Sequence, residues 1–232
     1  MEQLLVALDV DTADKALELS EQLAHLAGGF KIGSRLFTSE GPDFVQKMSG
    51  RGHRIFLDLK YHDIPNTVAD SVRAASDLGV WMLTLHTSGG SKMLTAAKEA
   101  AIKTSASPLL VGVTVLTSFD EESLSQLGIT RSINQQVEYL ATLAAQSGID
   151  GVVASPLEAA QIRSQCGNNF KIVTPGIRLR DTNTVNDDQV RAVGPREALN
   201  AGSDYLVVGR PIIAAPNPQA AAAAICSHSE DR

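Results

Sequence analysis

The chain has 232 residues, of which 44% are hydrophobic and 20% are charged, and its formal net charge at pH 7 is −6. This composition is typical of a globular protein, and the length is sufficient to bury one core, so we predict a single α/β domain over residues 1–232. The acidic balance argues against general binding of nucleic acid or of an anionic membrane surface, so an anionic ligand would need a local positive pocket.

Targeting signals and cysteines are sparse. No run of about 18 apolar residues occurs, so we expect no transmembrane helix. The N-terminus, Met1-Glu2-Gln3-Leu4, lacks the basic region of a signal peptide. Cys166 and Cys226 are the two cysteines, and neither has the spacing of a metal ligand. Together these features predict a cytoplasmic protein without a metal site.

Apolar runs rich in Val, Ile and Leu recur along the chain and predict eight buried strands. They cover residues 4–10, 30–33, 55–60, 81–86, 109–117, 151–155, 170–175 and 205–210, with helical spacing between them, for example at 13–26, 91–102, 134–146 and 196–201. This alternation indicates a parallel sheet covered by helices. Eight such units favour a closed (β/α)8 TIM barrel over an open doubly wound sheet. No Gly-x-Gly-x-x-Gly follows the first strand, which counts against dinucleotide binding.

Candidate site residues, most of them polar, stand at the ends of most of these strands. In chain order they are Asp9, Lys31, Asp58 with Lys60, His86, Thr117 with Ser118, Pro175 with Gly176, and Gly209 with Arg210. In a barrel these positions meet at the C-terminal mouth, where the active sites of this fold lie. Each has a structural explanation by itself, since Asp9 or Thr117 could cap a helix and His86 could line the barrel. The set as a whole favours a site.

Residues 58–67, Asp-Leu-Lys-Tyr-His-Asp-Ile-Pro-Asn-Thr, concentrate charge at the end of the third strand. Residues two apart in a strand share a face, which places Asp58 beside Lys60. Asp63 follows where the strand should end, because Pro65 prevents its continuation. Two carboxylates around one ammonium are costly unless every charge is paired. They form either a structural ion-pair network or, as we favour, a catalytic cluster.

The last two strand ends predict a phosphate site. Thr174-Pro175-Gly176-Ile177-Arg178 and Val207-Val208-Gly209-Arg210-Pro211 end the seventh and eighth strands, and the loops after these strands commonly bind phosphate in such barrels. Glycine allows close backbone approach, and arginine donates two parallel hydrogen bonds to phosphate. The polar segment 178–193, with Arg178, Arg180 and Gln189, has no apolar period, so it is either disordered or, as we favour, a lid.

Essentially the whole chain resembles orotidine 5′-monophosphate decarboxylases of the bacterial type. The resemblance is carried by Ala7-Leu8-Asp9, Phe30-Lys31-Ile32-Gly33, residues 58–67, Leu116-Thr117-Ser118, residues 174–178 and Gly209-Arg210-Pro211. Asp-x-Lys-x-x-Asp alone is shared with related barrel enzymes that act on sugar phosphates. Its continuation as Ile-Pro-Asn-Thr makes the motif specific.

The resemblance implies conversion of orotidine 5′-monophosphate to uridine 5′-monophosphate and CO2 in pyrimidine biosynthesis, without a cofactor. The implied ribose contacts are Asp9 and Lys31, and Lys60 is the implied proton donor. Thr117 or Ser118 would meet the pyrimidine, and the implied phosphate contacts in the last two loops are Arg178, Gln189, Gly209 and Arg210, beside Pro175. The resemblance also implies a homodimer in which Asp63 and Thr67 reach the partner's site.

The charges around Lys60 suit this chemistry. Loss of CO2 from C6 leaves a carbanion that the ring cannot delocalise, so a fixed cation must stabilise it. Asp58 and Asp63 would keep Lys60 charged, whereas an imine-forming lysine must be neutral. Two other functions stay open. One is a Mg²⁺-dependent sugar-phosphate enzyme, which the cationic Lys31 disfavours. The other is a catalytically silent nucleotide-binding protein on the same barrel.

Overall fold

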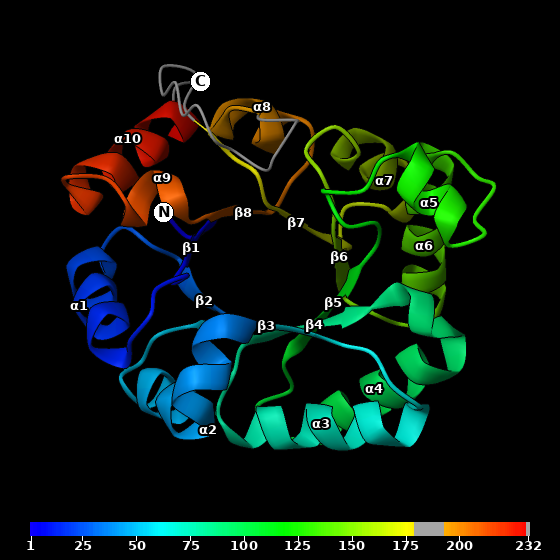
Figure 1. Ribbon diagram of the computed structural model, residues 1–232, viewed down its shortest axis with the longest axis horizontal. Coiled ribbons are helices and arrows are strands. Elements are labelled where there is room, and N and C mark those ends of the chain that lie inside the picture. The colour runs from blue at the N-terminus through cyan, green and yellow to red at the C-terminus, as the bar shows by residue number, and fades with distance from the viewer. Residues whose placement is uncertain (179–192, 231–232) are drawn as a thin grey trace.

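Eight parallel strands close into a barrel in the computed structural model, which describes residues 1–178 and 193–230 (Figure 1). The strands pair in chain order, and β8 pairs with β1, so the predicted (β/α)8 barrel is confirmed. They are β1 Leu4–Ala7, β2 Gly29–Gly33, β3 Ile55–Tyr61, β4 Met82–His86, β5 Leu109–Val113, β6 Gly151–Val153, β7 Lys171–Thr174 and β8 Tyr205–Val208. Gln189 and Arg180 lie outside the described residues.

Helices surround the barrel (Figure 1). They are α1 Ala13–Leu23, α2 Ser34–Gly50, α3 Pro65–Asp77, α4 Gly90–Ile102, α5 Glu121–Gln126, α6 Ile133–Gln146, α7 Ala159–Cys166, α8 Pro195–Asn200, α9 Arg210–Ile213 and α10 Pro218–Glu230, with the 3-10 turn η1 Thr87–Gly89. Local signals start several of them. The Thr12 side chain caps α1, Ser132 and Gln135 form a capping box at α6, and Pro65 occupies the first turn of α3. None of the described helices is long and apolar enough to cross a membrane.

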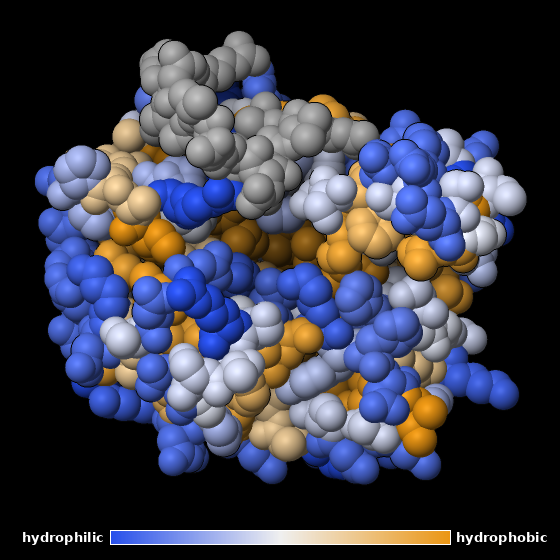
Figure 2. Space-filling model, in the orientation of Figure 1, coloured by the Kyte–Doolittle hydropathy of each residue, from blue (hydrophilic) through white to orange (hydrophobic). Residues whose placement is uncertain are grey.

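The strands bury both of their faces. On β1, Leu5 and Ala7 belong to the cluster inside the barrel, with Phe56 and Val207, whereas Leu4 and Val6 belong to the layer beneath the helices. This alternation follows from the two-residue period of a strand. Figure 2 shows the mouth of the barrel hollowed at its centre, with hydrophobic residues inside the hollow and hydrophilic residues along its rim.

Several strands end earlier than the sequence predicts. The apolar run 109–117 suggests a strand that ends at Thr117, but β5 ends at Val113. The reason is pairing, because Val113 is paired with His86 and Val153, the last residues of the neighbouring strands. Thr117 and Ser118 therefore lie on the loop beyond the strand. In the same way β1 ends at Ala7, before Asp9, and β8 ends at Val208, before Gly209.

Candidate active site

Alternating charges line the mouth of the barrel across its first three strands. The Lys31 ammonium lies 3.0 Å from Asp9 Oδ1 and 3.7 Å from Asp58 Oδ2. The Lys60 ammonium lies 2.8 Å from Asp58 Oδ1. The order Asp9, Lys31, Asp58, Lys60 follows from strand order, since β1, β2 and β3 are neighbours and Gly33 pairs with Asp58. The structure therefore brings these four predicted residues together.

Asp58 is the centre of this array, with a side chain that is 14% exposed. Burial by itself would raise the pKa of this carboxyl group. The ammonium groups of Lys31 and Lys60, with hydrogen bonds from Lys60 and Thr84, outweigh burial and lower the pKa below its ordinary value. Asp58 is thus ionised at neutral pH, and its carboxylate lies between the ammonium groups of both lysines.

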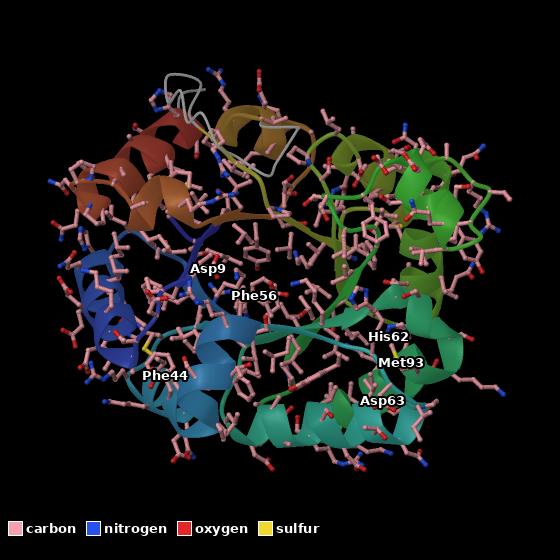
Figure 3. All side chains as sticks on the ribbon, in the orientation of Figure 1. Asp9, Phe44, Phe56, His62, Asp63 and Met93 are labelled. Atoms are coloured by element: carbon pink, nitrogen blue, oxygen red, sulfur yellow. The ribbon has the colours of Figure 1, made fainter. Side chains whose placement is uncertain are left out.

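The structure corrects the expectation that Asp58 and Asp63 flank Lys60 within one chain. Asp63 is exposed, and its Oδ1 accepts a hydrogen bond from the backbone N–H of Ile64 at 2.6 Å. In Figure 3, Asp63 lies beside His62 at the outer edge, away from Asp9. Because α3 begins at Pro65, the chain leaves the barrel rim just after Asp63. In the described part of the chain, Lys60 therefore has one aspartate partner, Asp58, which also pairs with Lys31.

The backbone of Lys60 departs from regular strand geometry. Its φ is +52°, and among the described residues it shares a positive φ with only one other non-glycine residue, Ser107. Its N–H donates to Thr84 Oγ1 at 2.8 Å, and the Thr84 hydroxyl donates to Asp58 Oδ1 at 2.9 Å. Sequence reasoning did not single out Thr84. The available signal was a hydroxyl inside the apolar run 81–86.

The opposite side of the mouth is less charged. Thr117 and Pro175 line one cavity together with Leu116, Phe119 and Gly176. Thr117 and Ser118 are both exposed, and Ser118 is not among the residues that line this cavity. The structure therefore brings Thr117 and Pro175 together across β5 and β7, and places Ser118 beside them on the same loop.

Gly209 joins the end of β8 to the charged array. A Cβ atom at Gly209 would lie 3.3 Å from both the Ala7 Cβ and Asp9 Oδ2, so glycine permits this close approach. Arg210 follows as the first residue of α9 and is exposed. Arg178, on the loop after β7, donates from its guanidinium to the Ile177 carbonyl oxygen at 2.9 Å. Its backbone N–H donates to the Val193 carbonyl.

His86 ends β4 beside the array, as predicted. Its ring lies 5.4 Å from that of His62, centroid to centroid. Burial, followed by the charges of His62 and Lys60, lowers the pKa of His86, so it is neutral at pH 7. Within residues 1–178 and 193–230, no group of three or more His, Cys, Asp or Glu residues could hold a metal ion.

The chain is similar to known proteins along most of its length. The model of the orotidine 5′-phosphate decarboxylase / HUMPS family matches residues 2–225. A protein from Saccharophagus degradans named orotidine 5′-phosphate decarboxylase is 52% identical over 216 residues, which are 93% of this chain and 90% of that protein. One of the same name from Legionella pneumophila is 49% identical over 225 residues, 96% of this chain and 97% of the relative.

Solved structures share the fold over nearly the whole chain. The crystal structure of orotidine 5′-phosphate decarboxylase from Lactobacillus acidophilus matches with a TM-score of 0.85 at 36% identity, covering 98% of each chain. An uncharacterized conserved protein from Geobacillus kaustophilus matches with a TM-score of 0.83 at 34% identity, covering 98% of this chain and 100% of the other.

Proposed function

Because this chain belongs to the orotidine 5′-phosphate decarboxylase / HUMPS family, we propose that it decarboxylates orotidine 5′-monophosphate to uridine 5′-monophosphate in pyrimidine biosynthesis. The observation that carries this proposal is the Lys31–Asp58–Lys60 array at the barrel mouth. It supplies fixed positive charge beside a hollow with an apolar interior (Figure 2). Such preorganised charge stabilises a developing carbanion, and the reaction then needs no electron-sink cofactor.

Lys60 performs the proton transfer in this mechanism. The bond between C6 of the pyrimidine and its carboxylate breaks, CO2 leaves, and the electron pair stays on C6. The Lys60 ammonium stabilises that pair and delivers a proton to C6, after which the neutral amine regains a proton from solvent. Asp58 holds the Lys60 ammonium in place beforehand, since its Oδ1 lies 2.8 Å from the ammonium. A charged lysine is also a poor imine former, which separates this mechanism from Schiff-base chemistry.

The remaining mouth residues bind the nucleotide. Asp9 and Lys31 take the ribose hydroxyls, and Thr117, with Ser118 and Pro175, meets the pyrimidine. Gly209, Arg210 and Arg178, with Gln189, bind the phosphate. The close approach of Gly209 to Asp9 supports this order, because ribose and phosphate are adjacent in the nucleotide. Gly209 allows its backbone to approach the phosphate, and each arginine can donate two hydrogen bonds to it.

The functional unit is a homodimer in which Asp63 and Thr67 serve the partner's site. Both residues are exposed in the single chain, and Ile64 between them is 66% exposed. Asp63 has no ion pair in the described residues, so its charge is available to a neighbouring subunit. We place this dimer in the cytoplasm, where reducing conditions suit the two cysteines, which form no disulfide.

Subunit mixing tests the dimer. Lys60→Ala and Asp63→Ala variants are each strongly impaired alone. In a mixed dimer the two defects fall in one site, and the other site is intact. Subunit exchange should therefore recover about a quarter of wild-type activity, because half of the dimers are mixed and each has one working site. If native mass spectrometry shows mixed dimers and no activity returns, Asp63 does not serve the partner.

The decisive test of the reaction is the loss of orotidine 5′-monophosphate absorbance when purified protein is added, with and without EDTA. We expect equal rates in both conditions and no loss with the Lys60→Ala variant. Activity that EDTA abolishes would favour the Mg²⁺-dependent sugar-phosphate chemistry of sibling enzymes. Lys31, 3.0 Å from Asp9 and 3.7 Å from Asp58, would oppose a divalent cation between these carboxylates.

A further inference from the structure

We propose that Thr84 is a positioning residue for the decarboxylation: its hydroxyl ties the backbone of Lys60 to the carboxylate of Asp58 and so aims the Lys60 ammonium into the site. This inference rests on the proposed function, because Lys60 must be the proton donor for its position to control the rate. Thr84 lies inside β4, one strand away from the two residues that it connects.

The pairing of β3 with β4 gives Thr84 its unusual place. Leu57 pairs with Leu83, and Tyr61 pairs with Leu85. Three residues of β3, from Asp58 to Lys60, therefore stand opposite the single residue Thr84. Such a bulge bends the strand and changes the direction of its side chains. The bulge includes Asp58 and Lys60, the two charged residues of β3 that the proposed mechanism uses.

The Thr84 hydroxyl replaces a backbone hydrogen bond that the bulge removes from the pairing of β3 with β4. It accepts the Lys60 N–H at 2.8 Å, in place of the carbonyl oxygen that a regular strand pair would supply. Lys60 adopts a φ of +52°, a conformation that side-chain-bearing residues rarely hold without support. The hydroxyl thus gives the Lys60 N–H a hydrogen-bond partner where the backbone is strained.

The same hydroxyl fixes the carboxylate. Thr84 Oγ1 donates to Asp58 Oδ1 at 2.9 Å, and that same oxygen receives the Lys60 ammonium at 2.8 Å. Both ends of Lys60, its backbone N–H and its Nζ, are therefore linked through one hydroxyl and one carboxylate oxygen. Thr84 is 1% exposed, so water cannot readily replace the hydroxyl. This closed ring sets the direction of the ammonium group.

Substitutions at Thr84 separate positioning from simple support of the fold. Thr84→Val keeps the shape and removes both hydrogen bonds. Thr84→Ser and Thr84→Ala both lose the methyl group and differ by one hydroxyl. The matched control is Thr114→Val, just after β5, because Thr114 is also buried but donates to the Val153 carbonyl oxygen rather than to the charged array.

We expect Thr84→Val to lower kcat by about 10- to 100-fold, with KM changed less than about threefold, because misaligned catalytic groups slow chemistry more than binding. Thr84→Ser should be about tenfold or more faster than Thr84→Ala. Thr114→Val should retain wild-type kcat even if it loses stability. The acid limb of the kcat profile should move to higher pH in Thr84→Val, because the lost hydrogen bond lowers the pKa of Asp58 in the wild type.

The outcomes separate this inference from the proposed function. If the wild type does not decarboxylate orotidine 5′-monophosphate, the proposed function is wrong. If the wild type is active but Thr84→Ser and Thr84→Ala have equal kcat, the hydroxyl does not position Lys60. The Ser and Ala pair decides the matter even if Thr84→Val does not fold. A Thr84→Val variant with the kcat and pH profile of Thr114→Val would also overturn the inference.

Discussion

The two ends of the barrel carry similar groups of charges, but the hydrogen-bond partners of these groups differ. At the mouth, Asp58 lies between Lys31 and Lys60. At the floor, where the strands begin, Asp204 lies between Arg163 and Lys171, at 2.6 and 3.5 Å. In each group one carboxylate lies between two cations, and that carboxylate is mostly buried. Composition and burial alone do not distinguish the two.

The partners of the charges distinguish them. At the floor, Asp204 Oδ2 accepts the backbone N–H of Ile172 at 2.8 Å, and Arg163 also donates to three carbonyl oxygens, those of Gly167, Phe170 and Gly202. These hydrogen bonds hold the starts of β7 and β8 together. A second aspartate at the floor, Asp150, repeats the pattern by accepting the Leu110 N–H at 2.9 Å and pairing with Lys98 at 2.5 Å.

At the mouth, Asp58 accepts hydrogen bonds only from side chains in the described part of the chain, those of Lys60 and Thr84. The Lys60 ammonium, with three donors, has one carboxylate partner there. Charges that are paired with backbone stabilise the fold, whereas charges that are paired with side chains retain donors for a substrate. This difference is consistent with a structural ionic cluster at the floor and with the catalytic cluster that we propose at the mouth.

The largest expected effect comes from removing the Lys60 ammonium from the mouth. Lys60→Ala should lower kcat by at least about 10⁴-fold, because the variant lacks both the stabilising charge and the proton donor of the proposed mechanism. Binding of uridine 5′-monophosphate, measured by calorimetry, should stay within about threefold of wild type, because this product lacks the carboxylate. Near-normal turnover would remove Lys60 from the mechanism.

Removing a charge at the floor should lower the stability of the fold and leave kcat unchanged. Asp204→Asn leaves Arg163 and Lys171 without their carboxylate and should lower the free energy of unfolding by about 2–3 kcal/mol, or Tm by about 5–10 °C. The kcat should be unchanged within about twofold, because the floor does not contact substrate. Asp11→Asn, which breaks the exposed pair with Arg35, is the control and should change neither quantity. A large loss of kcat in Asp204→Asn would contradict a purely structural role for the charges at the floor.

Lowering the pH should reduce the stability of the folded chain, because Asp58 at the mouth becomes protonated. Its pKa is lower in the folded chain than in the unfolded chain, so the group contributes stability that is fully present above about pH 4. That contribution is lost as the pH falls through the folded pKa. Urea unfolding between pH 7 and pH 2 should therefore show a shallower acid decline for Asp58→Asn than for the wild type. Identical declines would show that Asp58 is not held ionised by its neighbours.

The smallest effect is expected for Lys98→Met at the floor. The apolar stem is kept, and Asp150 still accepts the Leu110 N–H, so the loss of the partly exposed ion pair should cost about 1 kcal/mol of stability. Thermal unfolding at low and high salt would measure it. We expect high salt to narrow the difference from wild type. A loss as large as that of Asp204→Asn would mean that the ion pairs, rather than the backbone contacts, hold the floor.

The sequence by itself determined the barrel and the location of the candidate site. Strand and helix periods are local properties, and a parallel barrel brings every strand end to one mouth, so Asp9, Lys31, Asp58 and Lys60 had to meet there. The resemblance carried by residues 58–67 then indicated the reaction, and the family match agrees with it.

Only the tertiary structure decided which charges pair. The bulge in β3 and the start of α3 at Pro65 separate Asp63 from Lys60, and the order of β1, β2 and β3 places Lys31 beside Asp58 instead. Thr84 enters the array for the same reason. Its partners lie across the sheet, and register between strands depends on the closed barrel rather than on neighbours in sequence.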